Sequence, residues 1–149
     1  MKSNLKSVAV LVATSAAFAA INYTIIHNPL IFAITFVLIA HELGHYFAAH
    51  ANGAQADIPY IIPLPFIGIG VTRIKNFKKL SSKARKSILL SGPTAGVLTA
   101  LIIFFFLLLN PIIAPMALLA VALFEVLFNY IGSDGKNYRQ IVKDELSCI

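Results

Sequence analysis

Two histidines and a glutamate lie together in one of the most apolar stretches of the chain, the segment IAHELGHYFAAH at residues 39–50. On a helix, His41 and His45 differ by only about 40° around the axis, so both imidazoles can reach one metal ion. Glu42 is turned to the side by about 100°. The spacing H-E-x-x-H is typical of zinc hydrolases, in which the histidines bind the metal and the glutamate takes a proton from metal-bound water.

The apolar surroundings of these residues separate this interpretation from a simpler one. In a soluble helix, a polar trio that hydrogen-bonds to a neighbouring helix would be the better explanation. An acidic residue in the middle of a membrane span costs about 2.5 to 3.5 kcal/mol, so such residues are rare and mark functional sites. A dication bound by the two imidazoles would attract the nearby carboxylate and so offset the cost of burying it. We therefore favour a metal site at His41 and His45, with Glu42 as the general base.

A catalytic zinc ion usually has three protein ligands and an open fourth position for water. His50 is about 180° from His41 around the same helix and cannot join them. Asp134, in the segment NYIGSDGKNY at residues 129–138, is the favoured third ligand because it and the histidines lie near the same side of the membrane. Glu125, inside the last apolar run, is a second candidate. The glycines on both sides of Asp134 predict an unwound backbone that aims the carboxylate inward.

The composition is that of a membrane protein. Of 149 residues, 58% are hydrophobic and 12% are charged, whereas soluble domains are about half apolar and about a quarter charged. Four apolar runs are each near the roughly 20 residues that cross the hydrocarbon of a bilayer. They cover about residues 8–26, 29–51, 87–109 and 112–131. We therefore expect an all-α integral membrane protein with four transmembrane helices, folded as a single domain over residues 1–149.

The positive charges predict the orientation. The pairs Asn28-Pro29 and Asn110-Pro111 make two connections so short that the runs they join must form antiparallel hairpins. These two connections lie on one side of the membrane, and all twelve Lys and Arg residues lie on the opposite side. By the positive-inside rule, both termini and the middle connection are cytoplasmic, in a multi-pass protein of the cell membrane. The net charge of +6 is thus assigned to the lipid surface and not to nucleic acid.

Two segments allow more than one interpretation. The first run, with its two lysines and AFAA at residues 17–20, resembles a cleavable secretory signal, but it is long enough to span and we favour its retention. The segment ADIPYIIPLPFIGIGV at residues 56–71 holds too many prolines and glycines for a spanning helix. We expect a re-entrant or interfacial loop there, or a β-hairpin. Such a hairpin could pair along its edge with an extended substrate, and a loop that merely lies on the bilayer is equally compatible.

Three motifs in order along the chain resemble the site-2 protease family of intramembrane zinc metalloproteases. They are HELGH at 41–45, SGPTAG at 91–96 and NYIGSDG at 129–135, and IPLPFIGIG at 62–70 is similar to the loop that follows the metal-binding helix in that family. The resemblance covers about residues 30–140. It implies that His41, His45 and Asp134 bind one zinc ion and that Glu42 activates water. It also implies that Asn129 holds the substrate backbone.

The family resemblance implies an activity as well. Members of the site-2 protease family cut peptide bonds in or near transmembrane segments of other membrane proteins. The resemblance therefore implies a zinc metalloendopeptidase whose partners are such substrates and the lipid bilayer. An alternative is a non-catalytic membrane protein that binds or chaperones other membrane proteins in the same groove. A third hypothesis, a small transport or structural bundle with a polar core trio, predicts that no zinc is bound.

Overall fold

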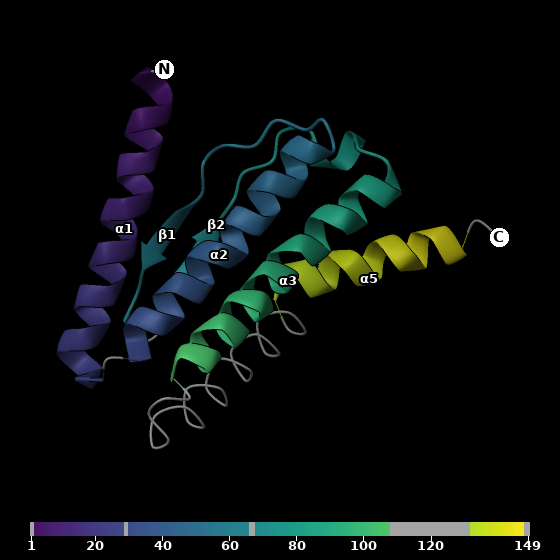
Figure 1. Cartoon of the computed structure of the whole chain (residues 1–149). Helices are drawn as coiled ribbons and strands as arrows, with labels where there is room; N and C mark the ends of the chain where they lie inside the picture. Colours follow the sequence, from purple (N-terminus) through teal and green to yellow (C-terminus); the bar gives the residue numbers. More distant parts are fainter. Residues whose placement is uncertain (1, 29, 66–67, 108–131, 148–149) are drawn as a thin grey trace.

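The computed structural model describes residues 2–28, 30–65, 68–107 and 132–147 (Figure 1). Helices and strands follow in the order α1 (Lys2–Ile26), α2 (Leu30–Ala51), β1 (Tyr60–Pro63), β2 (Gly68–Val71), the 3-10 helix η1 (Phe77–Lys79), α3 (Ser82–Leu107) and α5 (Ser133–Leu146). In this part of the chain, α1, α2 and α3 are long and apolar enough to cross a membrane. The fourth predicted span, 112–131, lies outside the described residues, so a total of four spans stays a prediction.

The break between the first two helices falls where the sequence predicts it. His27 has a left-handed backbone conformation, with φ of 52°, which commonly ends a helix. Asn28 then caps the next helix, because its side-chain oxygen accepts a hydrogen bond of 2.9 Å from the backbone N–H of Leu30. Helices α1 and α2 therefore end and begin on either side of the Asn28-Pro29 pair.

Helix α3 begins earlier than the apolar run that predicted it. Its first residue is Ser82, whereas the hydropathy of the sequence placed the start near residue 87. The Ser81 hydroxyl accepts a hydrogen bond of 3.2 Å from the backbone N–H of Ala84, which is an N-cap contact. The helix thus starts at its cap and carries part of the basic segment, including Lys86, in its first turns.

Helices α2 and α3 pack side by side in opposite directions (Figure 1). The contact is closest at Gly44, where an added Cβ would lie 2.5 Å from the Ser91 carbonyl oxygen and 2.9 Å from the Cβ of Ala95. Only glycine permits so short an approach between two helix backbones. This tight pairing places His45 of α2 directly against Ile88 and Gly92 of α3.

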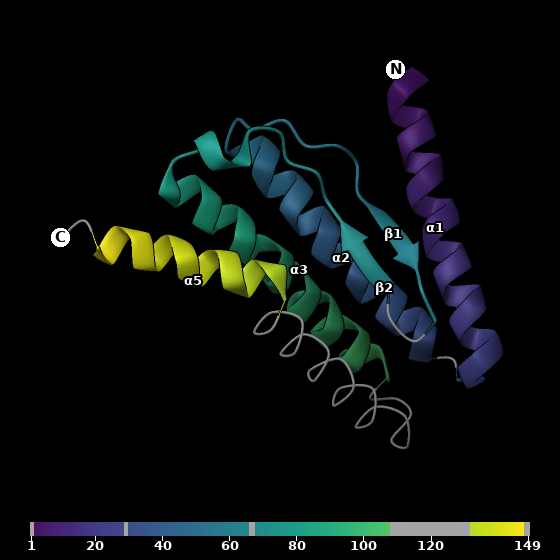
Figure 2. The ribbon, with the colours of Figure 1, turned by 180° about the vertical axis from the view of Figure 1, so that it is seen from behind.

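A two-stranded antiparallel hairpin lies between α1 and α2 (Figure 2). Tyr60 pairs with Val71 at its open end and Pro63 with Gly68 near its turn. The backbone N–H of Ile61 donates a hydrogen bond of 3.2 Å to the hydroxyl oxygen of Thr14, which joins β1 to α1. The hairpin interpretation of this segment is confirmed. Whether it re-enters the membrane stays a prediction.

The buried core is small and the outer surface is apolar. One cluster joins α1, α2 and β1 through Phe18, Ile31, Leu38 and Ile61. By contrast, large side chains on all three long helices are exposed, including Val12 and Phe36 at 62% and 63%. In water such a surface would be unfavourable, whereas lipid is as apolar as these side chains.

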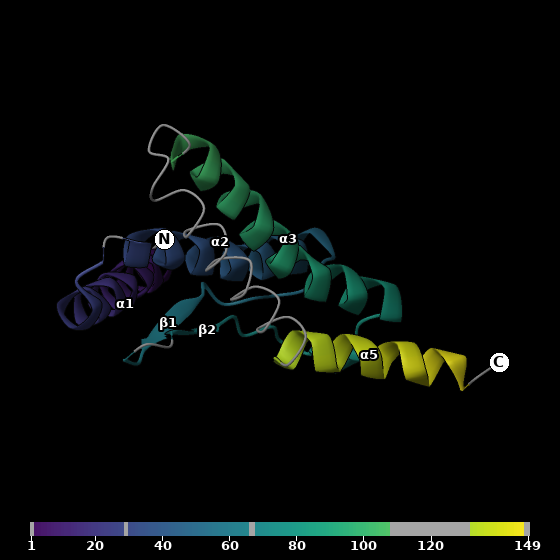
Figure 3. The same ribbon diagram turned by 90° about the horizontal axis from the view of Figure 1, so that it is seen from below.

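The hairpin and α5 lie on the same side of α2 (Figure 3). Helix α5 lies beneath the N-terminal half of α3 in Figure 3 and contacts it. Residues from α2, β2, α3 and α5, four separate parts of the sequence, line one pocket.

Candidate metal centre and active site

Three ligand atoms converge between α2 and α5. His45 Nε2 lies 3.2 Å from His41 Nε2 and 2.9 Å from Asp134 Oδ2, and His41 Nε2 lies 3.3 Å from the same oxygen. Both histidines are buried, and Asp134 is half-buried. The structure therefore brings together the three residues that the sequence proposes as metal ligands.

The separations of these atoms fit a zinc ion. Tetrahedral ligands at the usual zinc distances of 2.0 to 2.1 Å lie about 3.3 Å from one another. The three observed separations, between 2.9 and 3.3 Å, are close to that value. Two imidazole nitrogens and one carboxylate oxygen also form a common catalytic zinc set, which leaves a position for water.

A backbone carbonyl on α3 orients His45. Its Nδ1 lies 2.7 Å from the carbonyl oxygen of Ile88. A carbonyl can only accept, so Nδ1 carries the proton and Nε2 of the neutral ring presents its lone pair to Asp134. A lone pair and a carboxylate oxygen repel each other at 2.9 Å unless a proton or a metal ion lies between them. The donor set is thus arranged for a shared cation.

The charge state of Asp134 suits the role of a metal ligand. When the rings carry protons in place of a metal ion, burial raises the pKa of the Asp134 carboxyl group, whereas hydrogen bonds and positive charge from His41 and His45 lower it. The lowering effects are stronger together, and the pKa lies well below its ordinary value. The carboxyl group is therefore ionised at neutral pH, the form that binds a metal ion.

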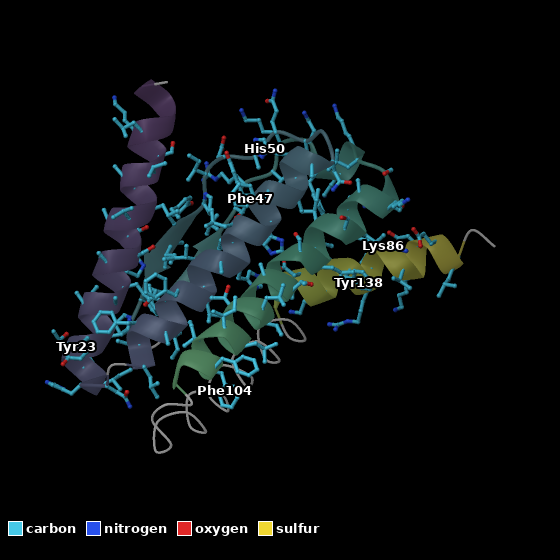
Figure 4. The ribbon with its side chains drawn as sticks, in the orientation of Figure 1. Tyr23, Phe47, His50, Lys86, Phe104 and Tyr138 are labelled. Carbon is cyan, nitrogen blue, oxygen red and sulfur yellow. The ribbon has the colours of Figure 1, made fainter. Side chains whose placement is uncertain are left out.

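Helix α5 presents Asp134 from its first turn. The backbone is extended at Gly132, with φ of −70° and ψ of 178°, and becomes helical at Ser133. The prediction of unwound backbone at Asp134 is wrong, because the helix begins one residue earlier. Farther along, Glu145 forms an ion pair with Lys86 of α3, and Figure 4 shows Lys86 where the two helices meet. This pair helps to hold α5, and with it Asp134, against α3.

Glu42 shares a pocket of about 360 Å³ with His45 and Asp134. The pocket is bounded by α2, by β2 and the residue after it, by α3 and by α5. The Thr72 hydroxyl donates a hydrogen bond of 2.6 Å to Glu42 Oε2. A carboxylate, a possible metal site and room for a ligand therefore occur in one place, as metal-assisted hydrolysis requires.

Comparison with known proteins decides the family. The sequence profile described as peptidase family M50 matches residues 29–147. The chain belongs to peptidase family M50. This is the site-2 protease family that the three motifs resemble. No solved structure matches the M50 chain.

Two Arabidopsis thaliana proteins are similar to part of this M50 chain. They are described as "Probable zinc metalloprotease EGY1, chloroplastic" and "Probable zinc metalloprotease EGY2, chloroplastic". Their identities to it are 36% and 37% over 70 residues, which is 46% of this chain. The matched segment spans only 13% and 12% of the lengths of these relatives. Both names specify zinc, and His41, His45 and Asp134 form a possible site for it.

The structure describes some, but not all, of the other residues that the sequence analysis named. Asn129 and Glu125 lie outside the described residues of the M50 chain, so their roles stay predictions. His50 is exposed and its Nδ1 lies 2.9 Å from the Tyr46 carbonyl oxygen, away from the metal ligands (Figure 4). Sequence reasoning missed Thr72 and Asn137, which line the pocket. Neither carries a motif that could have pointed to it.

Proposed function

We propose that this M50 chain is an intramembrane zinc metalloprotease that hydrolyses peptide bonds in or near transmembrane segments of other membrane proteins. The observation that carries the proposal is the convergence of His41, His45 and Asp134 in a chain with three membrane-length helices. Two of these residues, His45 and Asp134, share a pocket with Glu42. We place the protein in the cell membrane with both termini in the cytoplasm, because the positive charges gather on that side.

His41, His45 and Asp134 are the residues that would hold zinc, one ion per chain. Zinc bound there supplies Lewis acidity, which polarises a carbonyl group and lowers the pKa of water. Glu42 takes a proton from the attacking water and passes it to the departing amine. The carbonyl of Ile88 keeps the His45 ring in the tautomer that faces the site. Each of these tasks belongs to a side chain or backbone carbonyl that α2, α3 or α5 holds in place.

The substrate must expose a peptide bond, which a transmembrane helix hides in its own hydrogen bonds. Gly70 and Val71 of β2 line the pocket, whereas β1 is joined to α1 on the far side. Among the described residues, no backbone hydrogen bond occupies the outer edge of β2. We assign this edge to the unwound substrate, which would pair with it as an added strand beside Glu42. Asn129 is assigned the role of a further amide contact to the substrate backbone.

The test compares the parent with the Glu42→Gln variant, each reconstituted in vesicles. The probe is a panel of single-span test proteins tagged at both ends, with a Gly-Pro pair placed at different depths of the span. We expect zinc-dependent fragments from the parent, at least about 100-fold fewer from Glu42→Gln, and equal zinc in both. Equal cleavage by both proteins would reject the mechanism.

The alternative function, a non-catalytic protein that binds other membrane proteins, predicts a different result. In that case the test proteins would co-purify with the parent and with Glu42→Gln to the same extent, and neither would produce fragments. The pairing of Glu42 with a complete ligand set favours hydrolysis, because a binding groove alone needs no buried carboxylate beside two imidazoles.

A further inference from the structure

Thr72 lies directly after β2 and contacts Glu42 in two ways. Its hydroxyl oxygen is 2.6 Å from Glu42 Oε2 and 3.0 Å from the Glu42 backbone carbonyl oxygen. A carboxylate and a carbonyl can only accept, so the hydroxyl is the donor. The shorter distance is that of a charge-assisted O–H···O⁻ bond, which is stronger than the contact to a neutral carbonyl. The single hydroxyl proton is therefore directed mainly at the carboxylate.

The backbone of β2 also presses on the same carboxylate. A Cβ at Gly70 would overlap Oε1, Cγ and Cδ of Glu42, so the side of Glu42 that faces the strand has no room for another atom. Its other side faces the pocket. Glu42 has a long side chain that would otherwise sample several rotamers. The strand and the hydroxyl together leave it one position at the pocket.

The two carboxylate oxygens consequently differ. Oε2 is engaged by Thr72, whereas no hydrogen bond reaches Oε1 from the part of the chain that the structure describes. Glu42 and Thr72 both line the pocket that contains His45 and Asp134. An oxygen that no donor of the described residues engages is available here for a proton from water.

We propose that Thr72 is a positioning residue that holds Oε2 of Glu42 and leaves Oε1 to accept the proton of the attacking water. This inference rests on the proposed function, because it assumes that Glu42 is the general base. It also gives the hairpin a second task, since the same strand that borders the substrate path sets the orientation of the base.

The test uses two variants of Thr72, one that removes its hydroxyl group and one that keeps it. Thr72→Val keeps the shape and removes the hydroxyl, whereas Thr72→Ser keeps the hydroxyl and removes a methyl group. Thr94→Val serves as control, since Thr94 is exposed on α3 and, among the described residues, its hydroxyl bonds only the Leu90 carbonyl of its own helix. All are compared with the parent, as zinc-loaded protein in vesicles, on a test protein that the parent cleaves.

We expect Thr72→Val to lower kcat by about 10-fold or more, the factor that corresponds to one charge-assisted hydrogen bond. KM and zinc content should stay at the parental values, and Thr72→Ser should keep most of the activity. A rise in KM alone would make Thr72 a substrate contact, and loss of zinc in both variants would make it a packing residue. Either result, or parental kcat in Thr72→Val, overturns the inference.

A second measurement needs no substrate. Acetohydroxamic acid chelates zinc and gives its hydroxyl proton to a neighbouring carboxylate, so its affinity reports the position of Glu42. Calorimetry should give about 10-fold weaker binding to Thr72→Val than to the parent or Thr72→Ser. Equal affinities would overturn the inference even if no test protein is cleaved. A parent that neither cleaves nor holds zinc would reject the proposed function and this inference with it.

Discussion

Gly92 of α3 lies directly against the imidazole ring of His45 on α2, so that a Cβ at position 92 would overlap Nε2, Cε1 and Cδ2 of the ring. The ring is held on its other side by the Ile88 carbonyl, at 2.7 Å from Nδ1. One turn of α3 therefore both orients this candidate ligand and limits the space around it. The SGPTAG motif thus borders the possible metal site with a glycine, which has no side chain to displace the ring.

The first prediction concerns this contact. Gly92→Ala should displace the His45 ring, lower the stability by about 1 to 3 kcal/mol through overpacking, and reduce zinc per chain. Zinc is measured by mass spectrometry of the purified protein and stability by thermal unfolding. Thr94→Ala, two residues away and exposed, should leave both unchanged. Parental zinc in Gly92→Ala would show that the close packing is not needed for the site.

The second prediction tests the third ligand. Asp134→Ala should weaken zinc binding by about 100-fold or more, because loss of a ligand costs at least as much as loss of a group behind one. Asp144→Ala is the matched control on the same helix, since Asp144 is exposed and accepts a hydrogen bond from Gln140. Competition with a zinc chelator measures both affinities. Unchanged binding in Asp134→Ala would transfer the role to another residue, with Glu125 the next to replace.

The third prediction concerns the ion pair that joins α5 to α3. Both side chains are partly exposed, at 26% for Lys86 and 42% for Glu145, so the pair is worth only about 0.2 to 1 kcal/mol. Lys86→Glu should lower thermal stability by this amount and weaken zinc binding a few-fold, because α5 carries Asp134. The double variant Lys86→Glu with Glu145→Lys should restore both values. If the double variant stays as weak as the single one, the pair does not position α5.

The fourth prediction concerns orientation. Cys148 is the single cysteine of the chain, and a cytoplasmic C-terminus means that a membrane-impermeant maleimide labels it only after the cells are opened. The matched control is Asn110→Cys in a Cys148→Ser background, which the sequence places on the outside and which should react in intact cells. Labelling of Cys148 in intact cells would invert the proposed topology.

Much of the site follows from local sequence. His41, Glu42 and His45 are close together in the chain, and the geometry of a helix alone determines which of them share a face. Apolar runs likewise predict α1 and α2 to within a few residues at the Asn28-Pro29 break, because helix boundaries there depend on neighbouring residues. The start of α3 was harder to predict, since a serine cap and not hydropathy determines it.

The remaining parts of the site depend on contacts between distant segments. Asp134 is 89 residues from His45, and membrane depth favoured it over Glu125 without showing how its carboxylate would reach the histidines. Thr72 is 30 residues from Glu42, and nothing in its surroundings distinguishes it from other threonines.

The sequence by itself determined the membrane character, the family motifs and the helical face that carries the two histidines. Only the tertiary structure decided that α5 is helical at Asp134, that Thr72 holds one oxygen of Glu42, and that the Ile88 carbonyl orients His45. The physical reason is that local periodicity records which side chains share a face. Every residue has a backbone carbonyl, so only packing determines which one a side chain will meet.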